Sequence, residues 1–164
     1  MQGQKELYEV LNELSVPFEY YEHPPVATIE DAITHWKDYN SGRCKNIFFR
    51  NHKGDRHYLV ILEHLAKLNI KDLEQRLKQG KLTFASDQRL MKYLGLQPGS
   101  VSPFGLINDR EKHVHLFLDE KLLGFERLAF HPNINTATLV ISKPDFITFL
   151  MYCGNTFEFL QLYD

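Results

Sequence analysis

A stretch near the middle of the chain combines residues with special backbone conformations and small polar residues. Residues 98–105 read Pro-Gly-Ser-Val-Ser-Pro-Phe-Gly. Proline fixes φ and lacks an N–H, whereas glycine reaches φ values that a Cβ forbids, so the stretch predicts a rigid, bent loop. Its N–H groups belong to Gly99–Ser102, Phe104 and Gly105, and amides in such a bend can hold an oxyanion, carboxylate or phosphate. An ordinary multi-turn connector is the alternative.

Two further positions carry groups suited to chemistry. Lys45 lies two residues before the apolar run that starts at Ile47, where a partly desolvated ammonium would bind a phosphate or carboxylate. Its neighbour Asn46 alternates to the opposite side of the expected strand. His131 follows an expected strand and precedes Pro132, so its ring is presented at the rim of the sheet for proton transfer or ligand binding. His23, before Pro24-Pro25, has a weaker claim of the same kind. A snorkelling lysine and histidines without a task are the alternatives.

Other familiar chemistries find little support. His113 and His115 fall on one face of an expected strand, but no HExxH or paired-cysteine motif accompanies them, so we expect no metal. The chain has no GxSxG elbow, no GxxxxGK[ST] loop and no GxGxxG, which argues against a serine hydrolase and against nucleotide cofactors. Cys44 is expected to be a buried strand residue. We therefore predict an activity without a cofactor.

Composition indicates one folded domain over residues 1–164. The chain is 43% hydrophobic and 13% aromatic, enough for a core. No apolar run reaches the ~18 residues of a membrane span, and residues 1–6 carry no apolar signal region. Cys44 and Cys153 form neither a CxxC pair nor a disulfide framework. A cytoplasmic protein without membrane contact is expected.

Hydrophobic periodicity predicts alternating helices and strands. Expected helices cover residues 4–14, 29–39, 70–79, 87–94 and 144–152, with Thr28, Asn69 and Ser86 as N-caps. Expected strands cover residues 18–22, 44–49, 58–62, 82–85, 106–107, 113–118, 125–130, 136–141 and 157–162. The pattern predicts an α/β domain in which helices pack around a mixed sheet.

Charge is distributed unevenly along the chain. The net charge is −2, yet acidic residues dominate residues 1–31 and basic residues dominate 35–57 and 64–81. A local basic face on a nearly neutral protein suits one defined phosphate-bearing ligand better than sequence-blind nucleic-acid binding. Solvated surface lysines are the alternative.

Three segments occur together in an order typical of one family: 42–48 (GRCKNIF), 99–105 (GSVSPFG) and 130–133 (FHPN). From about Leu14 to Leu150, the chain resembles the YbaK/ProX aminoacyl-tRNA deacylases, above all the PrdX (ProXp-ala) branch. These are free-standing relatives of the prolyl-tRNA synthetase editing domain. The resemblance implies a curved, mostly antiparallel mixed sheet. It also implies hydrolysis of alanine wrongly attached to proline tRNA, with the tRNA acceptor end and prolyl-tRNA synthetase as partners.

The resemblance also implies roles for individual residues. The loop residues Gly99, Ser100, Val101 and Ser102 would lie around the ester carbonyl, Lys45 would bind the terminal adenosine or its phosphate, and His131 would line the pocket. The residues expected to bind substrate are Asn46, Pro103, Phe104, Gly105, His23 and Thr28. The substrate's 2′-hydroxyl would assist, with neither metal nor protein nucleophile. Deacylation of another mischarged tRNA (cysteine, serine or another small amino acid), a non-catalytic module that binds tRNA or a synthetase, and a metal hydrolase that uses His113 and His115 remain the alternatives.

Overall fold

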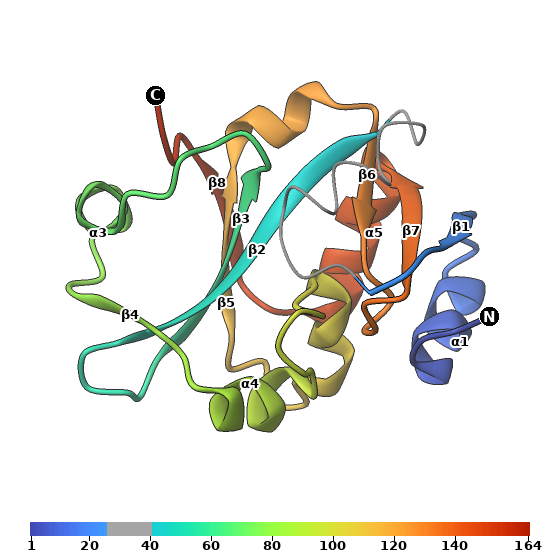
Figure 1. Cartoon of the computed structure of the whole chain (residues 1–164), viewed down its shortest axis with the longest axis horizontal. Helices are drawn as coiled ribbons and strands as arrows, with labels where there is room; N and C mark the ends of the chain where they lie inside the picture. Colours follow the sequence, from blue (N-terminus) through green and yellow to red (C-terminus); the bar gives the residue numbers. More distant parts are fainter. Residues whose placement is uncertain (26–40) are drawn as a thin grey trace.

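The computed structural model describes residues 1–25 and 41–164. These residues form an eight-stranded sheet in the order β1-β7-β6-β2-β3-β5-β8, with β4 paired to β2 (Figure 1). Among the strand pairs described, four are antiparallel and three are parallel. The predicted α/β fold with a mixed sheet is confirmed. The helix expected at 29–39 and its cap Thr28 lie outside the described residues.

The elements follow the expected order. The strands are β1 (Glu19–Glu22), β2 (Gly42–Asn51), β3 (His57–Glu63), β4 (Leu82–Phe84), β5 (His115–Asp119), β6 (Arg127–Phe130), β7 (Ala137–Ser142) and β8 (Phe157–Leu160). The helices are α1 (Lys5–Glu13), α3 (Ile70–Leu77), α4 (Asp87–Leu94) and α5 (Lys143–Cys153), with the 3-10 helices η1 (Pro103–Asn108) and η2 (Glu120–Gly124). The N-caps predicted for α3 and α4 are confirmed, because Asn69 accepts from Asp72 N and Ser86 accepts from Arg89 N.

Two predictions between α4 and β5 are wrong. Residues 106–107 are not a strand but part of η1, which Pro103 starts with its fixed φ and the Ser102 hydroxyl caps by accepting from Phe104 N at 3.1 Å. The next strand begins at His115 rather than at residue 113. The Asp109 carboxylate takes the N–H groups of His113 and Val114 instead, at 3.2 and 2.8 Å. In both places a local side-chain hydrogen bond replaces strand pairing.

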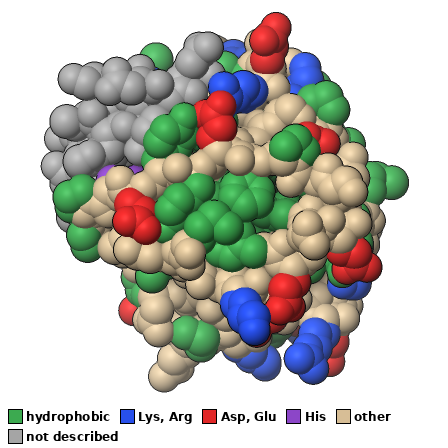
Figure 2. Space-filling view, turned by 90° about the vertical axis from the view of Figure 1, so that its right-hand side faces the viewer, with side chains coloured by type: hydrophobic (Ala, Val, Ile, Leu, Met, Phe, Trp, Pro, Cys, Tyr) green, Lys and Arg blue, Asp and Glu red, His purple; other side chains and the backbone are tan. Residues whose placement is uncertain are grey.

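The long strand β2 separates two hydrophobic cores. Its alternating side chains place Cys44 and Phe48 in the larger core, together with residues of α1, α4, η1, β6, β7 and α5. Phe49 lies in the smaller core on the other face, under α3. Strand β3 is buried at every position, as its continuous apolar run predicts. In Figure 2, which shows the side of the molecule to the right of Figure 1, hydrophobic side chains also gather near the centre of the surface.

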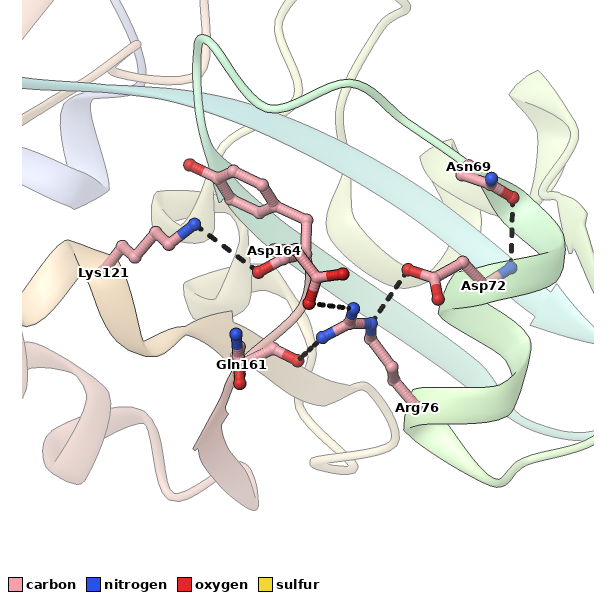
Figure 3. A network of polar contacts seen from close by, with 7 residues as sticks. Asn69, Asp72, Arg76, Lys121, Gln161 and Asp164 are labelled. Carbon is pink, nitrogen blue, oxygen red and sulfur yellow. Dashed lines mark hydrogen bonds and ion pairs between the residues drawn. The ribbon is translucent and has the colours of Figure 1, made fainter.

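A polar network attaches α3 to the C-terminal residues (Figure 3). Arg76 Nε donates to Asp72 at 2.8 Å, while its two terminal nitrogens donate to the Gln161 carbonyl at 3.0 Å and to the Asp164 carboxylate at 2.8 Å. Lys121 Nζ lies 3.6 Å from the centre of the Tyr163 ring. Hydrogen bonding to Arg76 lowers the pKa of Asp164. These contacts hold α3 against the sheet next to the chain end.

A histidine pair, in which His57 is buried and His113 partly buried, joins β3 to the segment before β5. His57 is 1% exposed, and its Nε2 lies 3.0 Å from the guanidinium of Arg89. Because a guanidinium only donates, Nε2 accepts and the ring proton is on Nδ1, which donates to His113 Nε2 at 2.8 Å. Burial, followed by the neighbouring charges, lowers the pKa of His57 to about 4. His57 is therefore neutral in the folded protein at pH 7.

This pair predicts a loss of stability in mild acid. The unfolded chain protonates His57 near its ordinary pKa of about 6.5, whereas the folded chain does so only near pH 4, so its stabilisation is complete above pH 6.5 and disappears toward pH 4. We expect the free energy of unfolding, measured with urea between pH 7 and 4, to fall by about 2–3 kcal/mol through this group. His57→Gln should show a smaller pH dependence than the wild type. If the free energy of unfolding depended on pH identically in the two proteins, His57 would not be the group responsible.

Candidate active site

Local hydrogen bonds shape the loop at residues 98–105. Gly99 has φ +86°, which favours glycine, and Ser100 N donates to the Gln97 carbonyl at 3.1 Å. Ser102 is fully buried, and its hydroxyl and carbonyl accept from Phe104 N and Gly105 N, each at 3.1 Å. The predicted bend is confirmed for residues 98–102, and η1 follows it. The Ser102 hydroxyl is a helix cap, which argues against a role as a nucleophile.

The same bonds determine which loop amides remain available. The N–H groups of Ser100, Phe104 and Gly105 are used within the loop. Among the described residues, those of Gly99, Val101 and Ser102 donate to no protein acceptor. Because Ser102 is fully buried, two of the six amides expected from the sequence, those of Gly99 and Val101, are open to a ligand oxygen in the described structure. Such an arrangement can stabilise a developing negative charge.

His131 and His23 lie together beside the end of β6. Their ring centres are 5.7 Å apart. His131 Nδ1 lies 2.8 Å from the Ala137 carbonyl, so the ring proton is on Nδ1, and Nε2 is an acceptor. His23 Nε2 lies 2.8 Å from the Thr138 hydroxyl. Burial lowers the pKa of His131, although the bond to Ala137 opposes this, so the ring is neutral at pH 7.

The turn after β6 contacts the bent loop. Asn133, which has φ +64°, donates through Nδ2 to the Phe104 carbonyl at 3.3 Å and to Gln4 Oε1 at 2.8 Å. A Cβ at Gly99 would lie 3.7 Å from Asn135 Nδ2. The structure thus brings the loop at residues 98–105 together with the turn at 131–136. Sequence patterns do not single out Gln4 or Asn135, because neither stands in a recognisable motif and Gln4 is far from this turn along the chain.

Lys45 and Asn46 point to opposite faces of β2, as the strand alternation predicts. Lys45 pairs with Leu62, and its Nζ donates to the Ala66 carbonyl, which places it on the side of the smaller core. Asn46 alternates toward the larger core, and its Oδ1 is buried without a hydrogen-bond partner in the described part of the chain. None of the hydrogen bonds described for Lys45 reaches the loop at residues 98–105 or His131. The grouping of Lys45 with that loop stays a prediction.

The other candidate residues, Cys44, His113 and His115, have different surroundings and do not form one site. Cys44 is 4% exposed, and burial raises the pKa of its thiol, so it is the buried strand cysteine that the sequence predicts. His113 faces His57, whereas His115 contacts the Thr156 hydroxyl at 2.6 Å and Glu158 at 3.2 Å. Over residues 1–25 and 41–164, no three histidine, cysteine or acidic side chains form a group that could hold a metal ion. In the same residues, no helix has the length and apolarity needed to cross a membrane.

Comparison with known proteins agrees with the motifs. Residues 23–149 match the family model described as an aminoacyl-tRNA editing domain. The chain is 38% identical to the prolyl-tRNA editing protein ProX of Acetoanaerobium sticklandii, over 99% of both chains. It is 34% identical to the prolyl-tRNA synthetase associated domain-containing protein 1 of Xenopus laevis, over 92% of both chains.

Solved structures share the fold. A crystal structure reported as a candidate trans-editing enzyme for prolyl tRNA synthetase superposes with a TM-score of 0.70 at 20% identity, over 97% of this chain and 98% of the other. The family model and the 38% identity to a ProX protein confirm the resemblance to ProX-type editing proteins. The chain belongs to the family of aminoacyl-tRNA editing domains.

Proposed function

We propose that this protein hydrolyses the ester of alanyl-tRNA(Pro) and releases alanine and tRNA(Pro). Family membership supports aminoacyl-tRNA editing. The observation that carries the proposal is the loop at residues 98–105, whose accessible amides at Gly99 and Val101 have no protein acceptor in the described residues and lie beside the turn that follows His131. Such a site suits an acyl ester whose carbonyl oxygen becomes negative during attack by water.

The reaction needs the loop chiefly as a hydrogen-bond donor. A water oxygen bonds to the ester carbon, and the loop amides stabilise the resulting oxyanion; one such donor typically contributes about 2.7–4 kcal/mol. The bond from carbon to the ribose oxygen then breaks. The ribose oxygen takes one proton of the water, and alanine leaves as its carboxylate while the second proton goes to solvent. The neighbouring ribose hydroxyl is in a position to assist this proton transfer, as the family resemblance implies.

Selection against proline is proposed to be steric. A synthetase pocket made for proline cannot exclude alanine firmly, because each missing methylene changes binding by only ~1–3 kcal/mol, and a second, smaller site can remove the error. His131 and His23 would form one wall of this second site, since their rings lie 5.7 Å apart and His131 is held by the Ala137 carbonyl. Neutral His131 shapes this wall without adding charge.

The tRNA body is proposed to lie on the lysine-rich surface of α3 and its flanking loops, where Lys67, Lys71, Lys78 and Lys81 are exposed. Phosphate contacts from such lysines give affinity without reading sequence, and they weaken as salt rises. Prolyl-tRNA synthetase is the proposed protein partner, and the cytoplasm is the proposed location.

A panel of mischarged tRNAs tests the proposal. Alanyl-tRNA(Pro) should be deacylated faster than cysteinyl-tRNA(Pro), seryl-tRNA(Ala) and correctly charged prolyl-tRNA(Pro) under single-turnover conditions with excess enzyme. Rapid release of cysteine or serine but not alanine would assign a different substrate. Tight tRNA binding without release of any amino acid would favour a non-catalytic module.

His131→Ala tests the steric wall. Removing the ring enlarges the site, so we expect the ratio of kcat/KM for alanyl-tRNA(Pro) over prolyl-tRNA(Pro) to fall by about tenfold or more. His115→Ala is the matched control, because His115 contacts Thr156 and Glu158 rather than the loop. A variant that remains folded with an unchanged ratio would remove His131 from the wall.

A further inference from the structure

A cavity lies at the opposite end of β6 from His131. It has a volume of about 630 Å³, within the usual range for small-ligand sites. Three segments form it: the start of β2, the end of β3, and the junction of η2 with β6 (Figure 1). Its lining residues are Ser41, Gly42, Arg43, Glu63, His64, Leu65, Gly124, Phe125, Glu126 and Arg127. We name it the Phe125 pocket. Its residues take no part in the proposed hydrolysis.

Because Gly42 has no side chain, the ring of Phe125 can lie in the wall of the pocket. A Cβ at Gly42 would lie 2.6 Å from Phe125 Cγ and 2.9 Å from Leu128 Cδ2, closer than atoms tolerate. Glycine therefore lets Phe125 pack against the backbone of β2. The ring is only half-buried there, and Leu65, on the same rim, is 73% exposed. A flat apolar wall next to an exposed leucine suits a planar ligand.

Hydrogen-bond donors and acceptors both surround the Phe125 ring. The guanidinium groups of Arg43 and Arg127 each carry several donors, and Glu126 is an exposed acceptor. Ser41 Oγ is buried and has no hydrogen-bond partner among the described residues. Because the walls mix guanidinium and carboxylate groups, they do not present the uniformly basic surface expected for a phosphate alone. A nucleobase fits better, since its edges carry donors and acceptors and its faces stack on aromatic rings.

Fixed contacts hold these walls in place. The Glu63 carboxylate accepts from Leu65 N at 3.0 Å and from the Tyr163 hydroxyl at 3.2 Å, and its other oxygen lies 2.7 Å from His64 Nδ1. His64 N donates to the Arg43 carbonyl at 2.8 Å, which joins the two strands that form the pocket. Arg127 is paired with Glu19 at 2.5 Å. A pocket with positioned walls loses little ordering entropy when it binds a ligand.

We propose that the Phe125 pocket holds one unpaired nucleobase of the tRNA acceptor end while the aminoacyl ester lies at the loop of residues 98–105. This inference rests on the proposed function. Arg127 begins β6 and His131 directly follows it, so the pocket and the ester site are separated by about 13 Å along the strand. A short single-stranded end can span this separation. The base would stack on Phe125, with Arg43, Arg127 and Glu126 at its edge.

The test uses an acceptor-stem hairpin that ends in unpaired ACCA, charged with alanine, and versions in which one unpaired nucleotide is abasic. Stacking on an aromatic side chain is worth about 1–3 kcal/mol per base, so Phe125→Ala should raise KM about fivefold or more with kcat unchanged. Phe125→Leu, which keeps the apolar contact with Gly42, should do the same. Leu123→Ala is the control, because Leu123 is exposed on η2 but does not line the pocket.

The abasic hairpins make the assignment specific. At one of the unpaired positions, the abasic change should raise the KM of the wild type as much as Phe125→Ala does. In the Phe125→Ala variant, the same abasic change should not raise KM further. An unchanged KM for both folded Phe125 variants, or additive effects at every position, would overturn the proposal. So would a dependence on Phe125 that appears only when prolyl-tRNA synthetase is present, since that result indicates protein docking.

Binding of the uncharged hairpin, measured by fluorescence anisotropy, separates this inference from the proposed function. Hydrolysis by the wild type together with binding that ignores Phe125 would overturn the base pocket and leave the deacylase intact. Binding that depends on Phe125 without any hydrolysis would support the pocket and remove the deacylase.

Discussion

Gly99→Val is expected to lower kcat for alanyl-tRNA(Pro) deacylation about 100-fold or more. Gly99 has φ +86°, a conformation that a β-branched residue adopts only with strain. The strained loop would move the accessible amides of Gly99 and Val101, and the new side chain would project toward Asn135, whose Nδ2 would lie 3.7 Å from the Cβ. Single-turnover deacylation with excess enzyme measures the effect on the chemical step directly.

Gly80→Val is the matched control for backbone strain. Gly80 has φ +79°, and no atom lies within 4 Å of the position of its Cβ, so valine there brings the same conformational cost without a steric clash. Both variants should lose similar stability in thermal unfolding, and only Gly99→Val should lose activity. Equal rates for the two folded variants would show that the loop at residues 98–105 does not bind the ester.

Lys45→Met is expected to reduce kcat/KM about 10- to 100-fold, the range for losing a hydrogen bond to a charged group. Methionine keeps the apolar stem of the side chain and removes only the ammonium. The expectation requires Lys45 Nζ to contact the substrate's terminal nucleotide, whereas in the free protein it donates to the Ala66 carbonyl. Steady-state kinetics with alanyl-tRNA(Pro), together with thermal unfolding, measures both consequences.

Lys67→Met removes the same charge one residue after Ala66, where the lysine is exposed. It should weaken tRNA binding slightly and in a salt-dependent way, without a specific loss of rate. If Lys45→Met instead lowers only the melting temperature and its kinetics match those of Lys67→Met, Lys45 serves to hold the turn of residues 63–66. The prediction that it binds substrate would then be wrong.

Local signals in the sequence were sufficient for most elements. The caps at Asn69 and Ser86, the continuous apolar run of β3 and the alternation of Lys45 with Asn46 all follow from interactions within a few residues. Such interactions depend on residue type and spacing, which a sequence displays directly. The family also followed from short motifs, because the loop, the lysine and the histidine occur in a fixed order along the chain.

Predictions were wrong where a side chain accepts hydrogen bonds from backbone amides that would otherwise pair in a strand. The expected strand at residues 106–107 became η1 because the Ser102 hydroxyl caps Phe104 N, and β5 starts two residues late because Asp109 takes two amides. Sequence patterns indicate that these residues can accept hydrogen bonds, but they do not show which amide lies within reach. The same limit applies to the loop amides, of which those of Gly99 and Val101 remain available in the described structure.

The sequence alone therefore determined the residue types of the candidate site, the order of its parts and the fold class. Only the tertiary structure decided that the turn holding Asn133 and Asn135 lies on the bent loop, that His23 lies beside His131, and that Phe125 packs on Gly42 in the wall of the Phe125 pocket. The physical reason is that these contacts join residues far apart along the chain. They arise from how the strands of the sheet pair and pack, which local periodicity does not specify.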